Sequence, residues 1–128
     1  MIRILLVEDE EHVRLLYQEE LEKEGYEVVC ASDGTTAVRL AVECPPNVVI
    51  MDINLPDKID GIESMSRILS HDRDIPVIIN TGYSEYKENF MSWAAEAYVL
   101  KSGDVTPLLE AVRTALKKRR SLGEPRQA

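Results

Sequence analysis

The sequence NVVIMDINLP, residues 47–56, indicates both the fold and the place of the chemistry. Residues 47–51 form a short and almost entirely apolar run, which is typical of a strand covered on both faces in a parallel sheet. Asp52 ends this run. Because ligands of open α/β sheets bind beyond the carboxyl ends of the strands, Asp52 could be a nucleophile, a metal ligand or a cap. A lone aspartate is more often a turn residue, so the ends of the other strands decide its meaning.

Length and composition favour one globular domain with a hydrophobic core, because the chain has 128 residues, of which 45% are hydrophobic. No apolar run approaches the ~20 residues of a membrane span. The start of the chain, MIRILLVEDE, lacks the pattern of a signal peptide. Cys30 and Cys44 have neither metal-ligand spacing nor a disulfide pattern. We therefore expect a cytoplasmic protein with buried thiols and no membrane contact.

The charge of the chain is unevenly distributed. The net charge is −8, yet the residues from Lys117 onward carry +4, so the first 116 residues carry −12. Such an acidic body argues against direct nucleic-acid binding and fits a protein that binds cations or a basic partner surface. The basic residues 117–120 would lie at the negative end of the last helix, where cations are favoured.

The hydrophobic pattern predicts five strand–helix units. Strands are expected at residues 2–7, 26–31, 47–51, 77–80 and 97–100, and helices at about 10–24, 33–44, 62–71, 84–94 and 104–120. Short connections and right-handed crossovers then give a parallel sheet with helices on both faces. Leu16 and Val42 are among the apolar positions expected to face the core. The fourth helix is polar for much of its length, so we expect it to be weakly anchored.

Four of the five predicted strand ends carry side chains suited to one kind of chemistry. Glu8 and Asp9 follow the first strand, Asp52 the third, Thr81 the fourth and Lys101 the fifth. In a parallel sheet these ends lie along one edge. Three carboxylates in one cleft repel each other, and a bound Mg²⁺ would relieve the repulsion. An aspartate nucleophile, a metal, a cation and a hydroxyl are the parts needed to hold an aspartyl phosphate.

The motifs LLVEDE, DINLP, NTG and AYVLK together resemble the receiver domain of two-component response regulators, of which the chemotaxis response regulator is the single-domain example. The resemblance covers about residues 2–120. It implies a flavodoxin-like α/β fold, with a doubly wound five-stranded parallel sheet in the order 2-1-3-4-5 and helices on both faces. We accordingly expect a receiver domain at residues 1–120 and a disordered tail at residues 121–128.

The resemblance also implies a role for each residue at the edge of the sheet. The implied roles are a metal pair in Glu8 and Asp9, a phosphoacceptor in Asp52, a phosphate-binding pair in Thr81 and Lys101, a switch aromatic in Tyr98, and a further metal ligand in the backbone carbonyl of Asn54.

The sequence departs from the family pattern at three places. Lys101 is followed by Ser102, where the family usually has a proline after a cis bond. A cis bond without proline costs ~2.5–4 kcal/mol, so the sequence leaves cis and trans open here. The loop at residues 56–61 is one residue longer than usual, and Ala94-Ala95 replaces a Gly-Ala turn. None of these changes removes a predicted catalytic group.

The predicted function is that of a stand-alone receiver. A sensor histidine kinase or a phosphotransfer protein would donate a phosphoryl group to Asp52 in the presence of Mg²⁺. The surface formed by the fourth helix, the fifth strand and the fifth helix would then switch to bind a downstream protein target, which the sequence does not identify. The protein would assist its own phosphorylation and dephosphorylation without being a dedicated enzyme, as a monomer or as a phosphorylation-dependent homodimer.

Three alternatives remain open at this point. The chain could be a receiver fragment cut from a larger response regulator or hybrid kinase. A phosphatase of the haloacid dehalogenase type would have a second aspartate two residues after the nucleophile, where this chain has Asn54. A flavodoxin-like ligand-binding module would have a glycine-rich phosphate loop after the first strand, which this sequence lacks.

Overall fold

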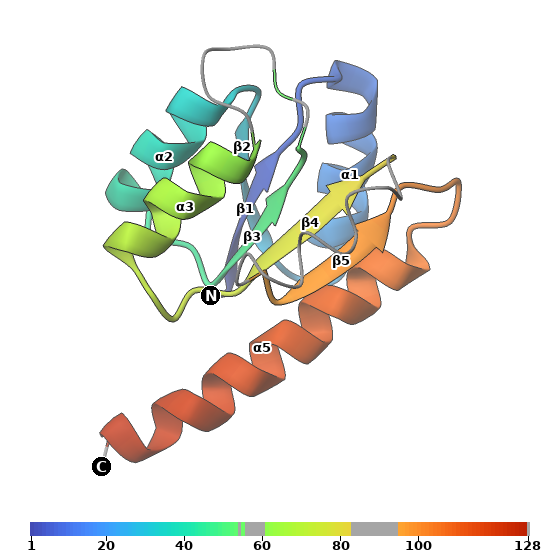
Figure 1. Cartoon of the computed structure of the whole chain (residues 1–128). Helices are drawn as coiled ribbons and strands as arrows, with labels where there is room; N and C mark the ends of the chain where they lie inside the picture. Colours follow the sequence, from blue (N-terminus) through green and yellow to red (C-terminus); the bar gives the residue numbers. More distant parts are fainter. Residues whose placement is uncertain (54, 56–60, 83–94, 128) are drawn as a thin grey trace.

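The structure is a computed structural model of the whole chain, and it describes residues 1–53, 55, 61–82 and 95–127, with side chains up to residue 118. Five parallel strands form one sheet in the order β2-β1-β3-β4-β5, which confirms the predicted doubly wound fold (Figure 1). The described elements are β1 (Arg3–Val7), α1 (Glu11–Lys23), β2 (Glu27–Ala31), α2 (Gly34–Glu43), β3 (Val48–Met51), α3 (Gly61–His71), β4 (Val77–Thr81), β5 (Ala97–Leu100) and α5 (Thr106–Gln127).

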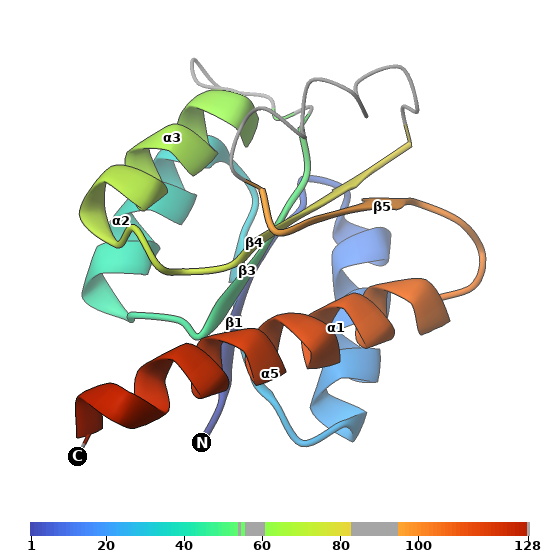
Figure 2. The ribbon, with the colours of Figure 1, turned by 60° about the horizontal axis from the view of Figure 1, so that its bottom comes forward.

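The sheet lies between two layers of helices. α2 and α3 cover one face, and α1 and α5 cover the other (Figures 1 and 2). β3 shows how the sequence produces this arrangement. Val49 and Met51 pack into the apolar cluster beneath α2 and α3, whereas Val48 and Ile50 pack into the cluster beneath α1 and α5. Successive strand residues point to opposite faces, so a strand that is covered on both sides must be apolar throughout.

The boundaries of α1 and α2 agree with the prediction, but one residue predicted to face the core in each helix is exposed. The Asp33 carboxylate caps α2 by accepting a hydrogen bond from the Thr36 amide at 2.7 Å, and Gly25 follows α1 with a positive φ of 92°. Leu16 and Val42, however, are 51% and 47% exposed. Each lies one residue, or about 100° around the helix, from the buried stripe of its helix, so it points past the core.

The two cysteines are free and half-buried, so they are less buried than the sequence predicted. The peptide bond between Lys101 and Ser102 is trans, since no bond within the described ranges is cis. None of the described helices is long and apolar enough to cross a lipid bilayer.

The last helix is longer than the sequence predicted. α5 continues to Gln127, so residues 121–127, which were expected to be a disordered tail, are helical. This run, SLGEPRQ, includes Gly123 and Pro125, which are poor helix formers, so local helix propensity does not predict the extension. In Figure 2 the end of α5 extends past the sheet. The predicted fourth helix, residues 84–94, lies outside the described residues.

Candidate functional site

Backbone hydrogen bonds place the predicted site residues along one edge of the sheet. The Asp52 amide donates to the carbonyl of Val7 at 3.1 Å, and the Lys101 amide donates to the carbonyl of Thr81 at 2.7 Å. The Glu8 amide likewise donates to the carbonyl of Ala31, the last residue of β2, at 3.0 Å. These bonds continue the parallel ladder one step beyond the strands. The residues that follow β1, β3 and β5 therefore emerge along the same edge of the sheet.

Three carboxylates gather at this edge. Glu8, Asp9 and Asp52 each offer an oxygen atom, and these atoms lie within 4.8 Å of one another. Glu8 and Asp52 are buried, with 2% and 5% of their surface exposed, whereas Asp9 is exposed. The predicted acidic cluster therefore exists, and two of its members are largely shielded from water.

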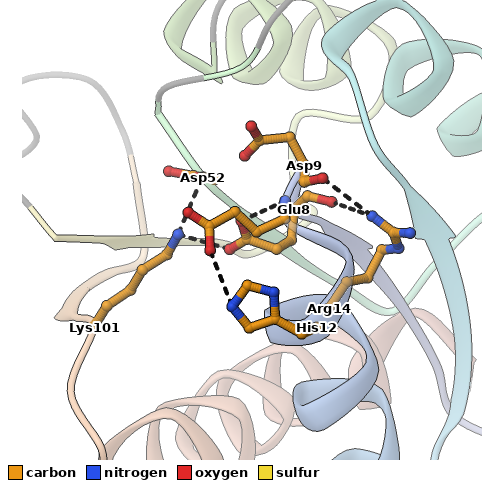
Figure 3. A network of polar contacts seen from close by, with 7 residues as sticks. Glu8, Asp9, His12, Arg14, Asp52 and Lys101 are labelled. Carbon is orange, nitrogen blue, oxygen red and sulfur yellow. Dashed lines mark hydrogen bonds and ion pairs between the residues drawn. The ribbon is translucent and has the colours of Figure 1, made fainter.

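Lys101 contacts both buried carboxylates of the cluster and offsets one of their two negative charges (Figure 3). Its Nζ atom lies 2.7 Å from Glu8 Oε1 and 3.1 Å from Asp52 Oδ2. The second carboxylate oxygen of Glu8 accepts a hydrogen bond from the amide of Glu10 at 3.2 Å. Both oxygens of Glu8 therefore have partners, which offsets the cost of burying its charge.

The pKa values of Glu8 and Lys101 reflect the burial of both groups and their attraction to each other. Burial raises the pKa of Glu8, and the negative charge of Asp52 adds to this effect, while Lys101 opposes it. Burial alone would lower the pKa of Lys101. The hydrogen bond to Glu8 and the charges of Asp52 and Glu8 outweigh burial, so the pKa of Lys101 is raised. Lys101 is therefore held as a cation beside the candidate phosphoacceptor.

Thr81 and Tyr98 lie beside the cluster on neighbouring strands. Thr81 is the last residue of β4 and is fully buried. Tyr98 of β5 is half-buried, pairs in register with Ile79 and packs against the apolar cluster beneath α2 and α3. Thr81 thus ends its strand at the edge that carries Asp52, whereas Tyr98 lies three residues before Lys101 within β5. Asn54, whose carbonyl was predicted to bind metal, lies outside the described residues.

Two residues at the site were not predicted from the sequence. The guanidinium of Arg14 donates hydrogen bonds to the backbone carbonyls of Glu8 and Asp9. Gly61 lies directly against the backbone of Asp52, where a Cβ atom would stand 2.0 Å from the Asp52 carbonyl oxygen. The sequence contains a signal for each: an arginine one turn into the helix that follows the acidic pair, and a glycine at the end of the loop after Asp52.

The carboxylate cluster fits a Mg²⁺ ion. Glu8, Asp9 and Asp52 offer hard oxygen ligands within reach of one ion. Mg²⁺ is commonly held by one or two carboxylates, with water and phosphate oxygens in its other positions. The exposure of Asp9 leaves room for such oxygens on the solvent side of the cluster. The residues therefore suit Mg²⁺ together with a phosphate group.

Comparison with known proteins identifies the family. The model of the response regulator receiver domain matches residues 4–113. The chain belongs to this family. This is the family that the sequence motifs resemble, so the prediction from the motifs is confirmed.

Curated relatives of this receiver domain are longer proteins. The regulatory protein AtoC of Escherichia coli is 37% identical over 117 residues, which cover 90% of this chain and 25% of AtoC. The transcriptional regulatory protein PdtaR of Mycobacterium tuberculosis is 37% identical over 123 residues, which cover 94% of this chain and 59% of PdtaR. This chain thus spans between a quarter and three-fifths of the length of these two relatives.

Solved structures of receiver domains superpose on the chain over nearly its whole length. The response regulator protein TrrA from Thermotoga maritima, in complex with Mg(2+)-BeF, has a TM-score of 0.85 and 40% identity, covering 91% of this chain and 100% of TrrA. A CheY-like receiver domain protein from Methanospirillum hungatei has a TM-score of 0.89 and 28% identity, covering 96% of this chain and 99% of that protein. The similarity in structure and the family match therefore identify the same kind of domain.

Proposed function

We propose that this receiver domain accepts a phosphoryl group on Asp52 from the phosphohistidine of a sensor kinase or of a phosphotransfer protein. One observation carries the proposal. The buried carboxylate of Asp52 contacts the ammonium of Lys101, which also contacts Glu8, and its oxygen lies within 4.8 Å of oxygens of Glu8 and Asp9. Membership of the receiver family supports the same assignment.

The proposed transfer is a displacement at phosphorus. An oxygen of the Asp52 carboxylate attacks the phosphorus atom, and the P–N bond to the donor imidazole breaks. The bonding electrons stay on the imidazole nitrogen, which takes up a proton from solvent, so the donor side chain leaves as neutral imidazole. The ammonium of Lys101, 3.1 Å from Asp52 Oδ2, is placed to pair with a phosphoryl oxygen. The Thr81 hydroxyl is the second group proposed to bind the phosphoryl group.

Mg²⁺ would be held by Glu8, Asp9 and Asp52, the three residues whose oxygen atoms lie together. When bound, the ion would neutralise negative charge on the phosphoryl oxygens. The relative TrrA is described in complex with Mg(2+)-BeF, which supports this choice of metal. The receiver would promote only its own phosphorylation and dephosphorylation.

The signal is proposed to leave through the surface that includes β5 and α5. Lys101 follows β5 directly, and its amide is bonded to the carbonyl of Thr81. Tyr98 lies on the same strand. A phosphoryl group that engages Thr81 and Lys101 would therefore alter the position of β5 and favour a partner, or a second copy of the chain, that binds this surface.

The test is covalent labelling with a small phosphodonor. Incubation with acetyl phosphate and Mg²⁺ should add the mass of one phosphoryl group to the intact protein. Asp52→Asn should abolish the addition, since an amide is a poor nucleophile, whereas Asp74→Asn provides a control at an exposed aspartate. Labelling that persists in Asp52→Asn would place the phosphoacceptor elsewhere. Phosphotransfer from a panel of sensor kinases would then identify the donor.

A further inference from the structure

Arg14 fixes the backbone that carries the acidic pair. Its Nη1 atom donates to the carbonyl of Glu8 at 3.0 Å and lies 3.4 Å from the carbonyl of Asp9 (Figure 3). Arg14 belongs to the first turns of α1, and its own amide donates to the carbonyl of Glu10 at 2.9 Å. One side chain of the helix thus reaches back to two consecutive peptide groups of the connection before it.

The connection between β1 and α1 lacks another common restraint. The residue at the N-cap of α1 is Glu10, and its side chain makes no capping hydrogen bond. A side-chain cap ordinarily helps to fix the path by which a chain enters a helix. Besides the contacts of Glu8 to β2 and to Lys101, the restraints on this connection include the Glu10 amide bond to the Glu8 carboxylate and the two carbonyl contacts of Arg14. Arg14 therefore helps to fix the path of the chain into α1, as a side-chain cap does in other helices.

We propose that Arg14 is a positioning residue for the Mg²⁺ site, an inference that rests on the proposed function. Arg14 does not contact the ion. It holds the peptide groups of Glu8 and Asp9 so that both carboxylates face Asp52. Partners of this kind, one contact away from the metal, commonly change metal affinity ~10–100-fold when they are removed.

Charge and positioning predict opposite effects of removing Arg14. The guanidinium of Arg14 is a positive charge next to the peptide groups of the acidic pair, and it repels Mg²⁺, so the loss of its charge alone should tighten Mg²⁺ binding. The loss of its two carbonyl contacts should loosen the acidic turn and weaken binding. The sign of the change in affinity therefore separates the two effects.

The experiment compares Mg²⁺ titrations of the wild type, Arg14→Gln and Arg14→Lys, followed by amide chemical shifts. Arg39→Gln is the matched control, because Arg39 is an exposed arginine on α2 that pairs with Glu43. We expect Arg14→Gln to weaken Mg²⁺ binding about tenfold, near the low end of the range for such partners. Arg14→Lys, which keeps one donor group, should recover part of the loss, and Arg39→Gln should bind as the wild type does.

A second measurement needs no metal. In Arg14→Gln, hydrogen exchange at the Glu10 amide should accelerate about tenfold or more while the midpoint of urea unfolding stays near that of the wild type. If Arg14→Gln does not fold, Arg14→Lys serves for both measurements, with smaller changes in the same direction. Unchanged or tighter Mg²⁺ binding in the Arg14 variants would overturn the role of Arg14. A wild-type protein without Mg²⁺ affinity would instead refute the proposed function, and the positioning role with it.

Discussion

At the scale of single residues, Gly61 shows how closely the loop after Asp52 is packed. Its amide donates to the carbonyl of Ile53 at 2.9 Å, and its Cα faces the peptide group of Asp52. A methyl group added there would meet the Asp52 carbonyl oxygen at 2.0 Å. Because the contact is with backbone, it cannot be relieved by a rotation of a side chain.

Gly61→Ala should therefore displace Asp52 and destabilise the fold. Overpacking of this kind costs about 1–3 kcal/mol, which urea unfolding would detect. Labelling by acetyl phosphate should also slow markedly in the fraction that remains folded. Gly103→Ala is the matched control, because no heavy atom lies within 4 Å of the position of its added Cβ. Equal rates and equal stabilities in the two variants would contradict the prediction.

Lys101 contacts both buried carboxylates and offsets one of their two negative charges, so its removal should make the stability of the fold depend more on metal. Lys101→Met leaves Glu8 and Asp52 without the ammonium that contacts both of them. The loss should be on the order of 2 kcal/mol, below that of a fully buried pair, because 25% of the Lys101 side chain is exposed. Mg²⁺ should restore more stability to the variant than to the wild type, since the ion replaces the missing positive charge.

Thermal unfolding of Lys101→Met and wild type, with and without Mg²⁺, would measure this difference. Lys118→Met is a suitable control, because Lys118 pairs with Glu96 in an exposed position on α5. A Mg²⁺-induced rise in Tm that is equal in all three proteins would show that Lys101 and the metal do not share the same carboxylates.

The sequence predicted side chains at strand ends better than contacts to the backbone. Asp52 and Lys101 could be placed because a parallel sheet brings the carboxyl ends of its strands to one edge. Arg14 and Gly61 act through carbonyl groups of the residues beside them, and every residue has a carbonyl. An arginine early in a helix and a glycine at the end of a loop are common, so these sequence signals do not by themselves identify the contacts, and the structure was needed to find them.

At the scale of elements, the start of α5 depends on one exposed carboxylate. Asp104 Oδ1 accepts a hydrogen bond from the amide of Thr106 at 2.9 Å, as the side chain at the start of a helix commonly does. This hydrogen bond lowers the pKa of Asp104 below its ordinary value of 3.8. The stabilisation is therefore complete above pH 3.8 and is lost as the pH falls through the lowered pKa of the folded state.

An NMR titration of the Asp104 carboxyl carbon should thus give a pKa below 3.8. The Thr106 amide shift should move in the same pH range, because its acceptor is being protonated. In Asp104→Asn, which keeps an oxygen acceptor but has no proton to lose, the Thr106 amide should show no such step. A titration at or above the ordinary value would mean that the hydrogen bond contributes nothing to the start of α5.

The sequence predicted which helices exist more reliably than which of their faces are buried. The pattern of α1 contains several leucines, and spacing alone allows Leu16 or Tyr17 to define the core stripe. The structure buries Tyr17 and Leu21 and leaves Leu16 half exposed. A rotation of one residue around the helix, about 100°, separates these outcomes. The choice depends on how α1 lies against the sheet, which is a tertiary property that local spacing does not contain.

At the scale of the whole molecule, the order of the strands links the site to one side of the sheet. β4 and β5 lie on the side of β3 away from β1 and β2, so Thr81 and Lys101 both stand on the same side of Asp52. Ala97 and Val99 of β5 pack into the same apolar cluster as Leu108 and Val112 of α5. We therefore expect a movement at the end of β5 to reach α5 through packed side chains. By contrast, β2 lies at the opposite edge of the sheet from β5, and α2 covers the face opposite to α5.

A phosphate mimic should therefore perturb one side of the molecule. We expect Mg²⁺ and beryllofluoride, the pair named for TrrA, to shift the amide resonances at the acidic cluster, at Thr81 and along residues 95–116. Residues 34–43 of α2 should change little, because this helix packs on the other side of the sheet. Asp52→Asn should show none of the beryllofluoride shifts, which separates them from the effect of Mg²⁺ alone. Coupling of ~1–3 kcal/mol is typical between such sites and suffices to move a marginal equilibrium. Shifts confined to the acidic cluster and α1, with residues 95–116 unchanged, would show that the signal leaves through a different surface.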